Sequence, residues 1–476
     1  MKIRYGLVLA MVVGLGFTGC ASGGGGGSDS GAATIGGSGG ALGAGESPRD
    51  TDNTLAAEQH LNAGDESSDA AEAQMHYEAA LTSAQAAIAE DPRNPLAHRL
   101  AAMASMGAGD YESAAAHFDH AVELRPLYEF DFMGIREQAW LDQYNEATPY
   151  VQSGDYDGAA PHFENANAIY AERPEGFITL GQIYAQMRQH DDALRNLDVA
   201  LAFMDSETIS EVDSLTAQGW REQAEELPLL RAQVLADAGR LEEAVTAYEE
   251  MSAADPTNVE YKSGLATILM QTGREEEAFG VYDELLSMPG LSAGELFSIG
   301  VGFYQGDDYT RAASAFASAA EASMNDRDAL EMWARSLQLD SAYADVPPVA
   351  QRWAELDPAS PNVYLILAQA ANQNGDQTTT QEAIAAVDGL DVNVTDLQLR
   401  RSVGGGAVVS GSATNKKLAD GASVSLRFTF YDDGGSPIGS VTETVSMAGT
   451  DMAQVFQIQF DSAEMVGGYG YEVTGG

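Results

Sequence analysis

Few side chains in this 476-residue sequence combine the residue types and the spacing that catalysis requires. The single cysteine, Cys20, lies near the amino terminus, and there is no Gly-x-Ser-x-Gly elbow, phosphate-binding loop or HExxH motif. With 72 acidic residues, carboxylates come close together by composition alone, so a pair of them does not indicate acid–base catalysis. The sequence therefore predicts no enzyme activity, no cofactor and no small-molecule substrate.

Two groups of side chains carry atoms that could bind a metal ion. His117 and His120 are three residues apart, which places them on one face of a helix beside nearby carboxylates. The second group has oxygen ligands of the kind calcium prefers: Asp388, Asp391, Asn393 and Asp396. Their spacing does not match the EF-hand loop. Solvated helix surface explains the first group and a turn explains the second, so we expect no metal site.

Neutral amides recur at a regular interval and could bind a partner. Gln152 and Gln186 are separated by the same interval as Gln271 and Gln305, and Gln373 lies two such intervals further on. An amide both donates and accepts hydrogen bonds, so a row of amides suits the backbone of an extended peptide. Glutamine is also a good polar residue for a half-exposed helix position. Both explanations stay open at this point.

The same interval divides the sequence that follows residue 60 into units. They begin at 61, 95, 140, 174, 225, 259, 293, 327 and 361, with one insertion (129–139) before Trp140 and a longer one (208–224) before Glu225. Position eight is small in every unit: Ser68, Ala102, Ala147, Gly181, Ala232, Ala266, Gly300, Ala334 and Ala368. Position 20 is alanine in seven units, and position 24 is large: Phe118, Phe163, Leu197, Tyr248, Tyr282 and Phe316. Two helices cross closely where a small side chain meets a large one, so each unit predicts a helical hairpin.

A period of about 34 residues with this pattern resembles the tetratricopeptide repeat. The resemblance implies that residues 51–391 form a superhelical all-α solenoid of about nine hairpins. Together with the strands predicted for residues 392–476, this gives an α+β multidomain fold class. The first unit fits least well, since residues 64–69 have the composition of a loop, and we expect a degenerate cap there. We expect the two insertions to lengthen helices or add turns without breaking the stack.

The same resemblance implies a binding site. In this family the first helix of each unit lines a concave groove, with positions 2, 5, 9, 12 and 13 facing inward. The predicted protein-binding residues are Gln152, Gln182, Gln186, Gln233, Gln271, Phe297, Tyr304, Gln305, Gln369 and Gln373. Leu229 and Leu365 would add apolar contacts beside them.

The amino terminus resembles a bacterial lipoprotein signal. Lys2 and Arg4 precede an apolar stretch that ends at Phe17, and Cys20 follows after Thr-Gly. The apolar stretch is too short to span a bilayer comfortably, which argues against an uncleaved membrane anchor. We therefore predict a signal peptide over residues 1–19, lipidation of Cys20, and a flexible Gly/Ser-rich tether over residues 20–50. The expected location is the bacterial envelope, at the outer membrane facing the periplasm.

The charge of the chain restricts its partners. It has 24 basic and 72 acidic residues, a formal charge of −48, which excludes nucleic acid as a partner because phosphates would be repelled. Two explanations of the acidity stay open: adaptation to high salt, in which lysine is avoided, and attraction of a basic partner.

Residues 392–476 differ from the repeats, because their apolar residues no longer follow the period of a helix and instead alternate with polar residues. Val424, Leu426, Phe428 and Phe430 alternate with polar residues, and the turn residues 432–435 follow. Further alternating segments end at Val445, Phe460 and Val473. This predicts a small antiparallel β-sandwich. The segment 428–432, Phe-Thr-Phe-Tyr-Asp, resembles the signature of the bacterial FxLYD domain, which adds a fold and no function.

The sequence thus favours a non-enzymatic scaffold that binds other envelope proteins or extended peptides through its helical groove. Outer-membrane, pilus and secretion assembly are pathways in which such lipoproteins take part. The alternative is a cell-wall or glycan-binding sandwich carried on a solenoid that serves as a spacer.

Overall fold

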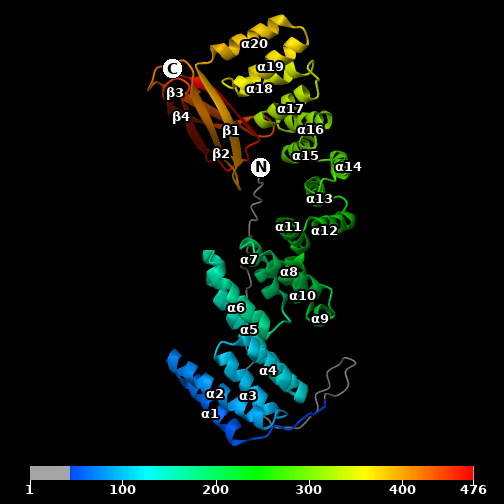
Figure 1. Ribbon diagram of the computed structural model, residues 1–476, viewed down its shortest axis with the longest axis vertical. Coiled ribbons are helices and arrows are strands. Elements are labelled where there is room, and N and C mark those ends of the chain that lie inside the picture. Colours follow the sequence, from blue (N-terminus) through cyan, green and yellow to red (C-terminus); the bar gives the residue numbers. More distant parts are fainter. Residues whose placement is uncertain (1–42, 475–476) are drawn as a thin grey trace. The chain divides into compact units, whose positions relative to one another are not determined.

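The computed structural model describes residues 43–474, in which pairs of helices are followed by six strands (Figure 1). The chain divides into two compact units, one ending at Gln138 and the other beginning at Ala139. The described residues contain nine helical hairpins, and the predicted solenoid followed by antiparallel strands is confirmed.

The first unit holds two hairpins and the start of a long helix. Its helices are α1 (Asp52–Glu66), α2 (Ala70–Glu90), α3 (Pro95–Gly107), α4 (Tyr111–Leu124) and the first part of α5 (Tyr128–Ser153). The expected loop over residues 64–69 is wrong in extent, because α1 continues to Glu66 and only the short turn that follows is non-helical. Ser68 is exposed in that turn. The small residue at the close contact between α1 and α2 is Gly64 instead, where a Cβ would lie 2.7 Å from Cε1 of Tyr77.

Residues 44–49 run along the first unit and make hydrogen bonds with it. The Glu46 amide donates to the carbonyl of Leu124 at 2.8 Å, which satisfies one of the carbonyls left over at the end of α4. Arg49 and Asn94 exchange two hydrogen bonds, at 3.1 and 2.8 Å. The last residues of the tether predicted for 20–50 are therefore fastened to the first hairpins.

The second unit continues the pairing through the rest of the helical region. Its helices are α6 (Tyr156–Ile169), α7 (Pro174–Gln186), α8 (His190–Met204), α9 (Thr208–Glu211), α10 (Ser214–Ala224), α11 (Leu227–Asp237), α12 (Leu241–Ala254), α13 (Val259–Gln271), α14 (Glu275–Leu286), α15 (Ala293–Gln305), α16 (Tyr309–Ala322), α17 (Arg327–Leu339), α18 (Val346–Leu356), α19 (Pro361–Gln373) and α20 (Gln377–Gly389). The insertions behave as expected: the first lengthens α5 to 26 residues, and the second adds α9 and α10. Trp220 of α10 packs against Phe203 of α8, with ring centroids 5.5 Å apart.

The turn inside each hairpin after the first has one residue in the left-handed region, always at position 15 of the unit. Five of these residues are glycines: Gly109, Gly154, Gly239, Gly273 and Gly375. Arg188, Asp307 and Ser341 take φ values of 59°, 60° and 61° at the same place in the other three hairpins. Glycine adopts this conformation without steric strain, so the turn is encoded locally in most hairpins and imposed by the stack in the rest.

Helices within a hairpin approach closely where a small residue faces a large one. A Cβ on Gly181 would lie 2.8 Å from Cδ2 of Leu197, and a Cβ on Gly300 would lie 2.7 Å from Cε1 of Phe316. Leu197 and Phe316 have no exposed surface. The small residue at position eight thus makes room for the large residue at position 24, as the sequence pattern predicts.

Two three-stranded antiparallel sheets pack face to face after α20. Their strands are β1 (Val392–Arg401), β2 (Ala407–Asn415), β3 (Ser423–Tyr431), β4 (Pro437–Ser446), β5 (Ala453–Phe460) and β6 (Gly468–Thr474). The strand orders are β1-β2-β5 and β4-β3-β6. Phe430 of one sheet stacks on Phe460 of the other, with centroids 4.4 Å apart. The alternating segments predicted from the sequence are therefore strands whose apolar sides form a shared core.

The sandwich lies beside the last hairpins (Figure 1) and contacts α17, α18 and α19. A buried ionic cluster lies at this junction. Asp357, which follows α18, is fully buried and accepts hydrogen bonds from Arg327 Nε at 3.0 Å and Trp353 Nε1 at 3.3 Å. The Tyr471 hydroxyl of β6 donates to the other oxygen of Asp357 at 2.6 Å and accepts from the Ala359 amide at 3.2 Å. Burial raises the pKa of Asp357, against the opposing effects of Arg327 and Tyr471.

Backbone contacts complete this junction. The Val394 amide of β1 donates to the carbonyl of Ala359 at 2.9 Å. A Cβ on Gly468 would lie 1.9 Å from the carbonyl oxygen of Asn325, so only glycine allows β6 to approach the turn before α17 this closely. The sandwich is therefore part of the second unit's packed structure.

The helix crossing can be tested with a matched pair of glycine substitutions. Gly300→Ala should lower the free energy of unfolding by about 1–3 kcal/mol, because Phe316 is buried and has no room to move. Gly280→Ala lies inside α14 with no atom near its new methyl group, so it should raise that energy by about 0.5–1 kcal/mol. Urea unfolding measures both. A shift of the same sign in the two variants would contradict the steric account.

Candidate functional site

The predicted glutamines lie at two levels of the first helices. Gln186, Gln271, Gln305 and Gln373 are the last residues of α7, α13, α15 and α19, and Gln152 lies one residue before the end of α5. All five are exposed, as is Gln369, whereas Gln182 and Gln233 are half-buried. The amides at position 13 therefore mark the ends of the first helices rather than their middle.

Three of the four predicted apolar side chains of the site are half-buried, and one is exposed. Phe297 is half-buried and meets the ring of Phe316 edge-on, with centroids 5.2 Å apart, so it holds α15 against α16. Tyr304 packs on Tyr309 with centroids 5.4 Å apart. Leu229 is half-buried, but Leu365 of α19 is 52% exposed. Leu365 is the one of these four side chains that offers a large apolar surface to a partner.

Two hairpins interrupt the row of amides at position 13, because α11 ends in Asp237 and α17 ends in Leu339. In α17, Glu331 and Arg335 occupy positions 5 and 9 and form an ion pair with 2.6 Å between Oε1 and a guanidinium nitrogen. Gln338 donates from Nε2 to Oε1 of Gln369 at 2.6 Å. The other predicted glutamines make no side-chain hydrogen bond within residues 43–474. The Glu331–Arg335 spacing of four residues is visible in the sequence and could have predicted this ion pair.

In the first candidate metal group, Nδ1 of His120 lies 3.1 Å from a carboxylate oxygen of Glu123. His117 and His120 of α4 face His98 of α3, with ring centroids 5.7 and 4.4 Å from that of His98. At the junction, Lys416 and Lys417 donate backbone hydrogen bonds to the carbonyl of Asp391. In the part of the chain that the structure describes, no three histidine, cysteine or carboxylate side chains are placed to hold a metal ion.

Burial distinguishes the three histidines. His98 is 6% exposed, and its Nε2 lies 3.1 Å from the carbonyl oxygen of Pro92. Its Nδ1 has no hydrogen-bond partner among the described residues. Desolvation lowers the pKa of both His98 and His117, and the neighbouring histidines add to the effect. The histidine cluster therefore favours the neutral form of both side chains.

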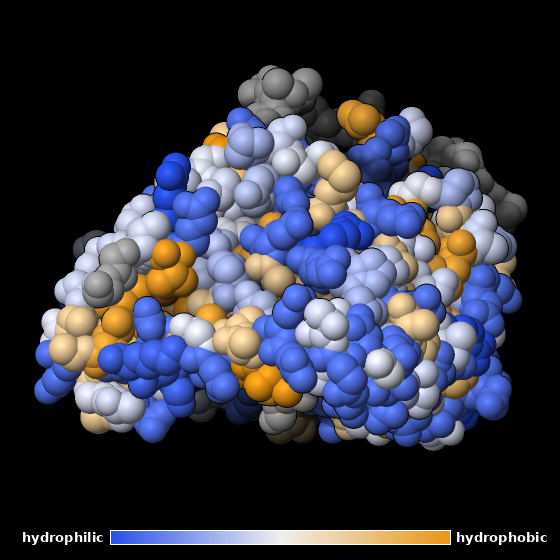
Figure 2. All heavy atoms as spheres, turned by 90° about the horizontal axis from the view of Figure 1, so that it is seen from above, coloured by the Kyte–Doolittle hydropathy of each residue, from blue (hydrophilic) through white to orange (hydrophobic). Residues whose placement is uncertain are grey.

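Acidic residues at position 25 tie neighbouring hairpins together. Asp119, Asp198 and Asp283 pair with Arg136, Arg231 and Arg311 of the next hairpin at 2.5, 2.5 and 2.8 Å. Such exposed pairs contribute little each. They show that part of the acidity is used inside the solenoid. The face seen in Figure 2 is mainly hydrophilic, with apolar side chains in small separate groups.

Comparison with known proteins supports the repeat assignment. Residues 66–129 and 229–294 match a family model described as tetratricopeptide repeat, and residues 150–219 match a second model of the same description. The hairpins in these segments are therefore similar to tetratricopeptide repeats, a fold that is typically a non-catalytic scaffold for protein interactions. The matched segments lie within the helices, so the FxLYD resemblance of the sandwich stays a prediction.

Solved structures of repeat proteins match parts of this chain. The C-terminal part of a TPR repeat-containing protein from Cytophaga hutchinsonii is 16% identical, covers 52% of this chain and 95% of its own, and has a TM-score of 0.41. A tetratricopeptide repeat protein from Parabacteroides merdae is 16% identical over 60% of this chain and 99% of its own, with a TM-score of 0.27. YrrB, a TPR protein with an unusual peptide-binding site, is 14% identical over 34% and 84%, with a TM-score of 0.30. No curated protein matches this chain.

The predicted envelope location rests on residues that precede the part of the chain that the structure describes. The signal peptide and Cys20 lie outside the described residues. Within residues 43–474, no helix has both the length and the apolar character needed to cross a bilayer.

The histidine cluster predicts a local dependence on pH. Because folding lowers the pKa of His98 and His117, their contribution to stability is complete above the ordinary value of 6.5 and is lost as pH falls through the folded values. Amide protection in α3 and α4 should therefore fall between pH 7.5 and 5.5. Hydrogen exchange, corrected for its intrinsic pH dependence, measures this.

Helices α13–α16 provide the internal control, since all seven histidines precede residue 191. Their protection should change less than that of α3 and α4 over the same range. His98→Gln should remove part of the difference, and an equal change in both regions would contradict the role of the cluster.

Proposed function

We propose that this chain is a non-enzymatic scaffold that binds other proteins through the first-helix face of its tetratricopeptide repeats. The observation that carries the proposal is the row of exposed amides at position 13, which make no side-chain hydrogen bond within the described residues. They are neutral in a chain of charge −48, where composition alone would place carboxylates. An extended peptide backbone has the recurring donors and acceptors that such a row can pair with.

The proposed setting is the bacterial envelope. Cys20 follows a signal that resembles a lipobox, and a diacylated cysteine would anchor the chain to a membrane. The partners would then be envelope proteins or extended peptides, at the outer membrane and facing the periplasm. Assembly of outer-membrane proteins, pili or secretion machinery are the pathways that this proposal favours.

One feature of the sandwich favours the alternative of glycan binding. A hollow of about 580 Å³ lies on β1, β2 and β5, and its lining includes Asp396, Gln398, Ser410 and Gln457 beside Phe456. These polar side chains can exchange hydrogen bonds with sugar hydroxyls, whereas the ring of Phe456 is buried in the sandwich core beneath them. Under this alternative the solenoid is a spacer.

The first-helix face can be tested by removing three of its amides. Gln271→Ala, Gln305→Ala and Gln373→Ala together should reduce partner recovery in crosslinking with mass spectrometry, since each lost contact in a desolvated site is worth about 1–3 kcal/mol. The matched control replaces three exposed glutamines of α18 and α20 in the same way: Gln351, Gln377 and Gln381. Alanine is a good helix former in both sets.

Equal recovery by the two triple variants would refute the first-helix face as the binding site. Recovery of peptidoglycan or polysaccharide in place of proteins would support the glycan alternative.

The lipid anchor is tested by Cys20→Ala. This variant should move from the membrane fraction to the soluble fraction, because it lacks the thiol that carries the lipid. Fractionation and immunoblotting measure the change, with Ser28→Ala in the predicted tether as the control. Retention of Cys20→Ala at the membrane would contradict lipidation at this residue.

A further inference from the structure

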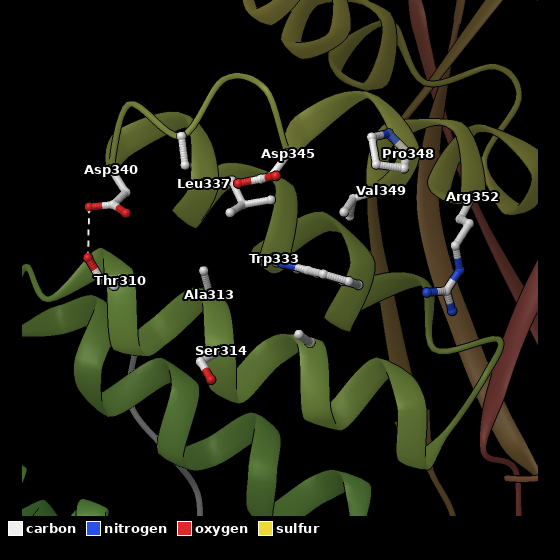
Figure 3. Close-up of a pocket in the computed structure, with 12 residues that line it drawn as sticks. Thr310, Ala313, Ser314, Trp333, Leu337, Asp340, Asp345, Pro348, Val349 and Arg352 are labelled. Atoms are coloured by element: carbon white, nitrogen blue, oxygen red, sulfur yellow. Dashed lines mark hydrogen bonds between the residues drawn. The ribbon is translucent and has the colours of Figure 1, made fainter.

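A hollow of about 520 Å³ lies between α16 and α18, two second helices of neighbouring hairpins (Figure 3). Its lining is mostly apolar and includes Ala313 and Ala317 of α16, Val349 of α18, and Trp333 of α17. Figure 3 shows the Trp333 side chain extending into the space between the helices. The hollow is built from second helices with α17 between them, so it is separate from the amides at the ends of the first helices.

Two local features of the sequence create this hollow. Ala313 is at position 21, where the three preceding hairpins have Leu194, Val245 and Phe279. In addition, α18 begins at Val346, which is position 20 of its unit, and two prolines follow. In the other hairpins, except the first, the second helix begins three residues earlier, at position 17. Proline has no backbone N–H to donate within a helix, so Pro347 and Pro348 fit only in the first turn, which explains the late start of α18. The small side chain of Ala313 and the late start of α18 together leave the space between the two helices open.

In the preceding hairpin, an arginine covers the corresponding place, and it is the one basic residue at position 19 among the units that follow the first. There, Arg311 lies over the rings of Phe279 and Phe303, at 4.6 and 4.8 Å from their centroids. Its guanidinium also pairs with Asp283 at 2.8 Å and Asp308 at 2.7 Å. A cation thus closes the space between α14 and α16 by contacting aromatic faces and carboxylates together.

The equivalent cation is absent one hairpin later. The position of Arg311 is taken by Asp345, so the rim of the hollow carries the carboxylates of Asp345 and Asp340. Asp340 accepts a hydrogen bond from Thr310 at 2.9 Å, and the Asp345 side chain has no hydrogen bond or ion pair among the described residues. Arg352, the basic residue in the lining, donates to the carbonyls of Ala320 and Met324 at 3.4 Å.

We propose that this hollow binds an arginine side chain carried by a partner protein. The alkyl stem of the arginine lies along Ala313, Ala317 and Val349, and its guanidinium meets Trp333 and the two rim carboxylates. Arginine fits better than lysine because its planar group stacks on an aromatic ring and pairs with carboxylates at the same time. The charge of −48 would attract such a basic segment to the surface.

The test uses the free side chain as the probe. N-acetylarginine amide, titrated into the purified protein labelled with 5-fluorotryptophan, should shift the Trp333 resonance saturably in the millimolar range. The chain has four tryptophans, and Trp333→Phe assigns the signal. N-acetylcitrulline amide has nearly the same shape without the charge and should bind more weakly, by about two- to fivefold.

Two variants connect the shift to the hollow. Ala317→Phe fills the space from the half-exposed side of α16 and should abolish the shift, with circular dichroism confirming the fold. Asp345→Asn should weaken binding by about two- to fivefold without changing any packing. Glu250→Gln, an exposed acid on α12, is the matched control and should leave binding unchanged.

Absence of a saturable shift, an equal response to arginine and citrulline, or a shift that survives Ala317→Phe would each overturn the proposal. Because the amides of the first-helix face are not part of this hollow, these outcomes do not depend on the triple glutamine variant.

Discussion

The close crossing of two helices inside each hairpin is the contact on which the helical part of this structure depends. It requires a residue without bulk at position eight and a large one at position 24, as Gly300 with Phe316 and Gly181 with Leu197 show. Because a hairpin buries little apolar surface alone, each one also relies on its neighbours. This double requirement explains why the pattern persists through two insertions: α5 lengthens and α9 and α10 are added, but the crossing is left unchanged.

The last hairpins meet a second requirement, which is to receive the sandwich. Asp357 is fully buried, and a buried carboxylate is tolerated only when donors surround it. Arg327 and Trp353 supply donors from the helices, and Tyr471 supplies one from β6. Removing any one partner would leave the others unsatisfied in a dry environment. The helices and the sandwich of the second unit are therefore coupled, and the sandwich is not a module tethered loosely to its end.

The first-helix face and the hollow between α16 and α18 differ in chemistry. The first-helix face offers neutral amides at the helix ends, which suit a peptide backbone. The hollow between α16 and α18 offers an indole and carboxylates, which suit a cationic side chain. A scaffold with both could contact one partner along its backbone and another through a single basic residue. The acidity of the chain, partly used in pairs such as Asp283 with Arg311, would assist the second contact.

The repeat, the hairpins and the strands could all be predicted from the periodic pattern of the sequence. Periodicity reports which residues must be small, large or apolar at contacts between neighbouring elements, and those contacts recur once in every unit. It failed at the first hairpin, where Gly64 rather than Ser68 meets the second helix, because a terminal unit has fewer neighbours to fix its register.

The packing of the folded chain, which no periodic pattern describes, establishes which predicted site residues remain available to a partner. Phe297 packs on Phe316, and Gln369 accepts from Gln338 of the preceding hairpin. The cluster around Asp357 and the hollow beside Trp333 join residues whose sequence separations follow no period. Such sites depend on how side chains from different elements fill or leave space, and that information exists only once the elements are packed.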